Sequence, residues 1–194
     1  MSGSSVSGVI LAAGSSTRMG EVNKLTKIWR GKPLVAHVMD AARSSTLSNI
    51  VVVTGHQSEQ VAECVGDGVD LVHNRDFATG MASSLRAGIA EVQSSDADAV
   101  LVLLGDMPLV SNDDIDQILS AFLEAGDDAI VQATFDGKPG NPVLIPKMYF
   151  DELLKVTGDK GARDLIKRYS NDRVLVEIGP AAAQDFDVPE AFES

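Results

Sequence analysis

Near the amino end of the chain, a glycine- and serine-rich turn is followed by two cations. Val9–Ala12 is an apolar run typical of a fully buried strand, and Ala13–Ser16 after it are too small and flexible to continue that strand. A turn of this kind points backbone N–H groups into a concavity that binds anions. Arg18 and Lys24 add positive charge at its rim. The ligand that suits this arrangement best is a polyphosphate, and the alternative is a simple tight connection.

A carboxylate stands where a second buried strand ends. Ala99–Leu104 is the most apolar run, and Gly105, Asp106 and Pro108 interrupt it. In open parallel sheets the ligand lies beyond the carboxyl ends of the strands, so we expect Asp106 and the glycine turn to share one crevice. A carboxylate beside phosphates suits Mg²⁺, which binds one or two carboxylates together with substrate oxygens. A turn or capping aspartate is the alternative.

A third segment, Gly80–Gly88, has small residues at the start of an expected helix. They would allow a flat ligand to approach closely, and the hydroxyls of Ser83 and Ser84 could recognise its polar edge. From spacing alone, an ordinary helix start with close packing is an equal alternative.

Strands and helices alternate along the chain. Strands are expected at 9–12, 50–54, 69–73, 99–105, 129–134 and 173–178, of which those at 9–12, 50–54 and 99–105 are read as buried. Helices are expected between them, and extended structure at 141–145 after a turn at 137–140. This order predicts a single-domain α/β protein, a three-layer α/β/α sandwich with a Rossmann-like, mostly parallel sheet. We assign residues 1–7 to a flexible leader and residues 8–194 to the domain.

Composition narrows the functional classes. The chain has 194 residues, 44% hydrophobic and 23% charged, which is ordinary for a globular domain. A formal net charge of −12 argues against nucleic acid and anionic membranes as partners. One cysteine excludes an intramolecular disulfide, and no apolar run is long enough to span a membrane. Without a recognisable signal peptide, the cytoplasm is the expected location.

Several segments together resemble one family. L-A-A-G-x-S-x-R-M-G with N-K-L behind it (residues 11–25) and L-G-D-M-P-x-V (104–110) resemble motifs of the molybdenum cofactor nucleotidyltransferases, and Ala13 favours the molybdopterin cytidylyltransferase-like branch. G-M-x-x-S-L-R-x-G (80–88), G-D-x-G-A-R (158–163) and D-x-D-x-P-E (185–190) follow in the family's order. The chain departs from the pattern at Lys138 and Pro139, where arginine is usual, and at Val188, where threonine is usual.

This resemblance implies the nucleotide-diphospho-sugar transferase fold and a Mg²⁺-dependent transfer of CMP from CTP to molybdopterin, with release of pyrophosphate. It implies that Asp106 holds the metal and that the segment from Gly80 borders the base. Asp187 is the candidate second metal ligand, and a capping aspartate before Pro189 is the alternative. Together with the residue patterns above, the resemblance predicts catalytic roles for Arg18, Lys24 and Asp106. The predicted nucleotide-binding residues are Leu11, Ala12, Ala13, Gly14, Ser15, Ser16, Arg18, Lys24, Gly80, Ser83, Ser84 and Asp106.

The expected partners are CTP, or GTP, and a pterin-phosphate cofactor, with a molybdoenzyme as a further recipient. Two alternative functions stay open. One is transfer of another nucleotide, as guanylyl transfer or as nucleotidyl transfer to a sugar or isoprenoid phosphate. The other is a non-catalytic chaperone that binds the cofactor, although such a binder would not need Arg18, Lys24 and Asp106 together.

Overall fold

The computed structural model describes residues 4–14 and 23–185. Its strands are β1 (Val6–Ala12), β2 (Ile28–Trp29), β3 (Lys32–Pro33), β4 (Asn49–Thr54), β5 (Asp70–His73), β6 (Ala99–Leu104), β7 (Ile130–Phe135), β8 (Lys138–Pro146) and β9 (Arg173–Glu177). Its helices are α1 (Leu34–Ser44), α2 (Ser58–Val65), α3 (Met81–Gln93), α4 (Asn112–Ala125), α5 (Phe150–Leu153) and α6 (Arg163–Arg168). Single 3₁₀ turns include Lys24–Thr26 and Phe77–Thr79.

The central sheet of the described residues has the strand order β5-β4-β1-β6-β8-β7-β9. β1 pairs in parallel with both β4 and β6, and β5 pairs in parallel with β4. β8 runs antiparallel to both β6 and β7, while β7 and β9 are parallel. The predicted mostly parallel α/β sheet is therefore confirmed. The run at Val9–Ala12 is apolar because parallel strands in the middle of such a sheet are covered on both faces.

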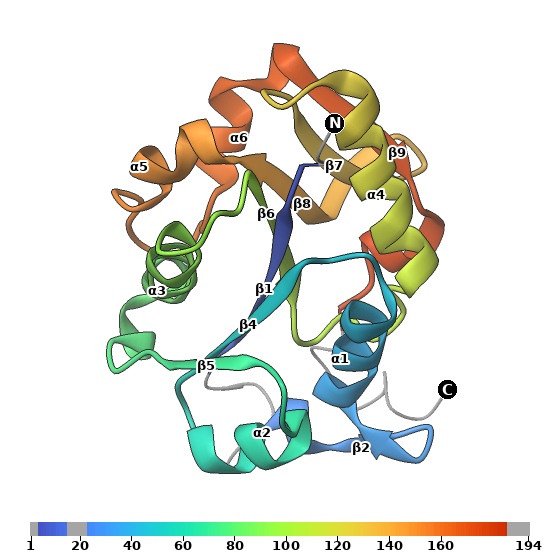
Figure 1. Ribbon diagram of the computed structural model, residues 1–194. Coiled ribbons are helices and arrows are strands. Elements are labelled where there is room, and N and C mark those ends of the chain that lie inside the picture. Colours follow the sequence, from blue (N-terminus) through green and yellow to red (C-terminus); the bar gives the residue numbers. More distant parts are fainter. Residues whose placement is uncertain (1–3, 15–22, 186–194) are drawn as a thin grey trace.

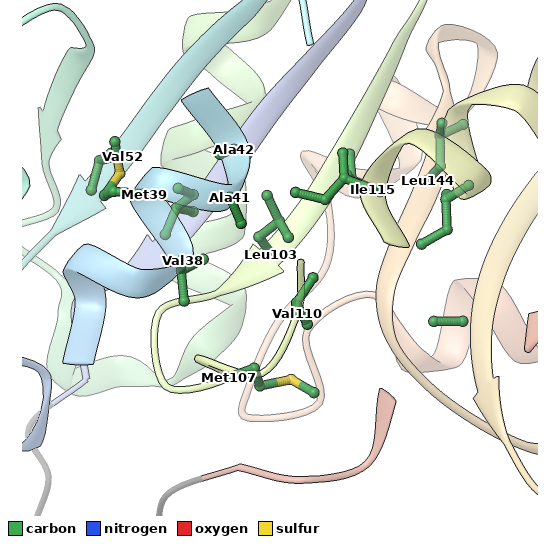
Figure 2. Close-up of a cluster of buried hydrophobic side chains, with 14 of the residues drawn as sticks. Val38, Met39, Ala41, Ala42, Val52, Leu103, Met107, Val110, Ile115 and Leu144 are labelled. Carbon is green, nitrogen blue, oxygen red and sulfur yellow. The ribbon is translucent and has the colours of Figure 1, made fainter. Parts of the chain in front are cut away.

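Helices cover both faces of the sheet and make three layers (Figure 1). Successive strand residues point to opposite faces, so Ile10 packs toward α1, α2 and α4, while Val9 packs toward α3, α5 and α6. Figure 2 shows the first of these cores, where Val38 and Met39 of α1 and Ile115 of α4 lie over the sheet. These two cores fix the strand ends from which the site residues emerge.

Local chemistry explains how two of the helices are placed. Ser111 accepts a hydrogen bond from the backbone N–H of Asp114, whose carboxylate accepts one from the backbone N–H of Ser111, so α4 begins with a capping box. Gly88 lets α3 lie close to the sheet, since a Cβ there would stand 2.5 Å from Cγ1 of Val9 and 3.1 Å from Cγ2 of Val53.

Two expectations from the sequence are wrong in detail. The segment 1–7 does not lie wholly outside the fold, because β1 begins at Val6 and the backbone N–H of Ser5 donates to the Asp98 carboxylate at 2.8 Å. Residues 137–140 are not all turn: Asp136 and Gly137 have φ angles of 49° and 71°, and β8 already begins at Lys138. A two-residue turn with positive φ at both positions matches the twist of a tight hairpin, which is why an Asp-Gly pair serves here.

In the described part of the chain, no helix combines the length and the apolar character needed to cross a membrane.

Candidate active site

Lys24 and Asp106 form an ion pair at the edge of the sheet. The Lys24 Nζ lies 2.5 Å from Oδ2 of Asp106, although 82 residues separate them in the sequence. Only 14% of the Lys24 side chain and 17% of the Asp106 side chain are exposed. Each charge is therefore largely withdrawn from water and compensated by the other.

Buried polar contacts fix Lys24 in place. Asn23, 1% exposed, caps the Lys24–Thr26 turn by accepting a hydrogen bond from the backbone N–H of Leu25 at 3.0 Å. The Asn23 amide also donates to the backbone carbonyl of His56, just beyond β4, at 3.2 Å. The turn that carries Lys24 is thus tied to the same edge of the sheet from which β1 and β4 end.

The neighbouring strands β1 and β6 bring Asp106 beside the glycine turn. Leu11 of β1 is level with Leu104 of β6, and the backbone N–H of Gly105 donates to the Leu11 carbonyl at 3.0 Å. Asp106 follows directly. Ala13 is 3% exposed, whereas Gly14 is exposed and a Cβ there would meet open space. The chain thus reaches the surface at Gly14, on the side where Asp106 leaves β6.

Several predicted site residues lie outside the described residues. These are Ser15, Ser16, Arg18 and Asp187. The described part of the predicted nucleotide loop is Leu11–Gly14, in which Leu11 is half-buried and Ala12 and Ala13 are buried. The structure therefore brings together Lys24, Asp106 and the end of β1, and the remaining roles stay predictions.

Ser83 and Ser84 are engaged inside the protein. Both side chains are 5% exposed, and the Asn74 amide donates to their hydroxyls at 2.8 and 3.0 Å. The Ser83 hydroxyl also lies 2.8 Å from the Gly80 carbonyl and 3.0 Å from that of Asp76. These contacts bind the start of α3 to the segment after β5, which is the packing role that the sequence had left open. Sequence reasoning missed Asn74, because no local pattern connects it to α3.

A loop closes over the beginning of α3. Gly80 has a φ of +111°, and a Cβ there would stand 2.7 Å from the Gly158 carbonyl oxygen. The backbone N–H of Ala82 donates to that same carbonyl at 3.0 Å, and Arg86 donates to the Val156 carbonyl at 2.5 Å. The absence of a side chain at Gly80 therefore serves the approach of residues 156–161, and Arg86 anchors the same loop instead of reaching into solvent.

A cleft of about 600 Å³ extends from this edge across the sheet. Leu11 and Leu104 line one end, and Gln132 and Arg173 line the β7 and β9 region. The charged residues of its wall are Asp159, Lys160, Arg163, Lys167, Arg173 and Asp185, an excess of two cations in a chain whose net charge is −12. The local field thus favours an anionic ligand, in contrast to the charge of the whole chain.

Gln132 and Arg173 were missed as site residues. A polar residue in the apolar run Ala129–Thr134 was the available signal for Gln132, since a glutamine inside a buried strand needs a partner. Arg173 gave no such signal, because it opens the last strand at a position where a surface cation is ordinary.

The described residues fit a metal ion that the protein and a substrate bind jointly better than a metal ion bound by protein ligands alone. In residues 4–14 and 23–185, no group of three or more His, Cys, Asp or Glu side chains is arranged to hold an ion. Asp106 supplies one hard oxygen ligand at the strand end, and Mg²⁺ commonly uses one or two carboxylates with substrate phosphates. A substrate-bridged divalent cation is therefore compatible with Asp106.

Comparison with known proteins identifies the family. Residues 8–174 match the model of the MobA-like NTP transferase domain. The chain is 29% identical over 199 residues to the purine catabolism protein PucB of Bacillus subtilis, covering 96% of this chain and 93% of PucB. It is 36% identical over 124 residues to the bifunctional protein GlmU of Symbiobacterium thermophilum, covering 63% of this chain but only 26% of GlmU.

Solved structures share the fold of this chain. Rv0371c of Mycobacterium tuberculosis H37Rv superposes with a TM-score of 0.88 at 26% identity, covering 100% of both chains. A manganese complex of the same protein superposes at 0.82 with 24% identity, covering 98% of this chain and 97% of that one. Because the family model matches residues 8–174, which are most of this chain, the chain belongs to the MobA-like NTP transferase family.

Proposed function

We propose that this chain is a cytoplasmic, divalent-metal-dependent nucleotidyltransferase that transfers CMP from CTP to the phosphate of a pterin cofactor and releases pyrophosphate. The contact of 2.5 Å between Lys24 and Asp106 carries the proposal. It puts a cation and an acid beside the strand end where the glycine turn begins, which suits a triphosphate and its metal. Family membership supports nucleotidyl transfer, and Ala13 in the L-A-A-G motif supports cytidine.

The chain's residues act mainly by positioning and by stabilising charge. An oxygen of the acceptor phosphate attacks the α-phosphorus of the triphosphate, and the bond to the leaving pyrophosphate breaks. Such a transfer needs no covalent nucleophile on the protein. In this proposal the backbone from Gly14 to Ser16 holds the phosphates, and Arg18 and Lys24 stabilise the charge on the transferred and leaving groups.

Lys24 and Asp106 must exchange partners when the nucleotide arrives. Without substrate, each neutralises the other. With a triphosphate bound, the Lys24 ammonium moves to phosphate oxygens, and the Asp106 carboxylate becomes available, with Asp187, to hold Mg²⁺. The metal when bound would neutralise phosphate charge and orient the two substrates.

Gly80, Ser83 and Ser84 support base recognition indirectly in this proposal. The bonds from Asn74 to the two buried hydroxyls fix the first turn of α3. Gly80 admits the 156–161 loop against that turn. The base is then bounded by a rigid helix start, and the choice of cytidine depends on the shape of this wall.

Pyrophosphate release tests the function directly. The protein is incubated with Mg²⁺ or Mn²⁺, molybdenum cofactor and each nucleoside triphosphate in turn, and pyrophosphate is measured. We expect release with CTP that requires both the metal and the cofactor. Lys24→Met should slow it by about 10²–10³-fold, the usual loss when one charge-stabilising donor is removed. Lys32→Met, which removes an exposed lysine paired with Asp40, is the matched control and should leave the rate unchanged.

Other outcomes would replace this function with a named alternative. Release with GTP only would indicate guanylyl transfer, and release only with a sugar or isoprenoid phosphate as acceptor would indicate another substrate class. Cofactor or nucleotide binding without any pyrophosphate would indicate a chaperone. Near-normal turnover of Lys24→Met would refute the role given to Lys24.

A further inference from the structure

Residues 156–161 form a loop that lies along one side of α3. The Arg86 guanidinium donates to the Val156 carbonyl at 2.5 Å, and the Ala82 backbone N–H donates to the Gly158 carbonyl at 3.0 Å. Positions four residues apart lie on the same face of a helix, so both bonds come from one side of α3. No other segment distant in the sequence forms a hydrogen bond with this loop in the described part of the chain.

A second hollow lies behind the loop. Its volume is about 470 Å³, and Val156, Thr157 and Gly161 form part of its wall. Gly161 also lines the cleft, so only the thickness of the loop separates the two hollows at that point. Gly158 and Gly161 have φ angles of +77° and +54° and no side chains with which to pack. The position of the loop therefore depends strongly on its bonds to α3.

The front of the loop forms part of the cleft wall near the expected phosphate site. α3 connects β5 to β6, which run in the same direction, so it begins at the carboxyl edge where β1 ends and the glycine turn starts. The residues that line the cleft here are Leu11 of β1, Met81 of α3, and Asp159, Lys160 and Gly161 of the loop. A nucleoside whose phosphates lie at the glycine turn would contact this wall.

We propose that Arg86 is a positioning residue for the nucleoside part of the substrate. It holds the 156–161 loop against α3 and so keeps the cleft wall in the shape that the base and ribose contact. Val156 is half-buried against the core, and the Arg86 bond to its carbonyl fixes the direction in which the loop leaves the core. Arg86 itself does not contact the substrate. This inference rests on the proposed function, in which a nucleoside triphosphate binds at the glycine turn.

Loss of the Arg86 bond should lower affinity through the fraction of molecules whose loop is in place. The apparent Kd of a ligand that needs such a segment rises by the inverse of that fraction. Removing one hydrogen bond to a charged group commonly shifts such an equilibrium by about ten-fold. We therefore expect Arg86→Met to raise the Kd for CTP about ten-fold. Inorganic tripolyphosphate, which has neither base nor ribose, should bind as before.

Calorimetric titration measures both ligands without any need for turnover. CTP and tripolyphosphate are each titrated, with Mg²⁺ present, into the unaltered protein and into Arg86→Met. Arg43→Met is the matched control, because the Arg43 guanidinium also donates to backbone carbonyls, those of Val65 and Asp67 beside α2. Its loss should leave both Kd values unchanged.

Limited proteolysis without nucleotide observes the loop itself. Lys155 and Lys160 are exposed, and trypsin should cleave after them faster in Arg86→Met than in the unaltered protein. Cleavage after Lys147, which is exposed and lies outside the loop, is the internal reference and should keep its rate.

Three results would overturn the proposal. If Arg86→Met weakens tripolyphosphate as much as CTP, Arg86 acts on the phosphates and not through the loop. Unchanged CTP binding, or unchanged cleavage after Lys155 and Lys160, would show that the bond does not position the wall. If Arg86→Met does not fold, Arg86→Lys, which keeps a cation near the same carbonyl, is measured instead and should show a smaller loss confined to CTP.

Failure of the proposed function would look different. The unaltered protein would then bind no nucleoside triphosphate, and the role of Arg86 in substrate binding would fall with it. The cleavage comparison would still decide whether Arg86 holds the loop, because it uses no ligand.

Discussion

The ion pair between Lys24 and Asp106 makes a quantitative prediction about stability. Exposed pairs contribute about 0.2–1 kcal/mol, whereas removing one partner of a fully buried pair costs about 3–5 kcal/mol. With 14% and 17% of their side chains exposed, these two lie nearer the buried limit. We therefore expect Lys24→Met, which leaves the Asp106 charge poorly solvated, to lower the free energy of unfolding by about 2–3 kcal/mol.

A double-mutant cycle isolates the interaction from other effects of each substitution. Lys24→Met, Asp106→Asn and the double variant are unfolded in urea and followed by the fluorescence of Trp29, the chain's single tryptophan, which is 5% exposed. The double variant should be more stable than the sum of the single losses predicts, by about 1–2 kcal/mol. This coupling arises because removing both charges leaves neither one buried without its partner.

A matched pair elsewhere in the chain provides the control. Lys32 and Asp40 also form an ion pair, but 40% and 55% of their side chains are exposed, and its cycle should give less than about 0.5 kcal/mol. If the Lys24 and Asp106 losses simply add, to within about 0.5 kcal/mol, the two side chains do not interact in solution. The placement of both at one site would then be wrong, and with it the basis of the proposed function.

Three further predictions concern the framework. Gly88→Ala should lower the free energy of unfolding by about 1–3 kcal/mol in urea denaturation, because its Cβ would meet Val9 at 2.5 Å; an unchanged value would contradict this packing. Ser111→Ala should cost about 0.5–2 kcal/mol through loss of the α4 cap, measured by thermal unfolding, while the exposed Ser120→Ala should stay within about 0.5 kcal/mol. Burial tends to raise the pKa of Glu177, but hydrogen bonds from the Thr134 hydroxyl and three backbone N–H groups outweigh it and lower the pKa. Glu177→Gln should therefore reduce the free energy of unfolding at pH 7. The difference in this free energy between the two proteins should shrink as the pH falls from about 4.3, the ordinary glutamate pKa, through the lower pKa of the folded state. Denaturation at several pH values would contradict this if the difference grew on acidification.

Features with a local cause could be predicted from the sequence. The buried strands follow from their continuous apolar runs, and the start of α4 follows from Ser111 and the acidic residues after it. The proximity of Lys24 and Asp106 follows from one general rule, that ligands gather at the carboxyl ends of parallel strands.

Features that depend on distant partners could not be predicted. The hydroxyls of Ser83 and Ser84 suggest ligand contacts until Asn74 is known to engage them, and nothing near Asn74 signals that contact. Arg173 and Gln132 stand 41 residues apart and meet only because β7 and β9 are neighbours in the sheet. The start of β8 was misjudged because Pro139 and Gly140 suggest a turn, whereas the Asp136–Gly137 pair makes it.

The reversal of direction at β8 has a consequence for how this family can diversify. Residues 4–106 contain strands β5, β4, β1 and β6, the turn with Lys24, and Asp106 directly after β6. Residues 130–177 contain β8, β7 and β9, which form the part of the cleft wall with Arg173. In the proposed function, mutations in the later half would therefore remodel the wall of the cleft, while the Lys24 and Asp106 pair, which comes from the earlier half, would be inherited unchanged.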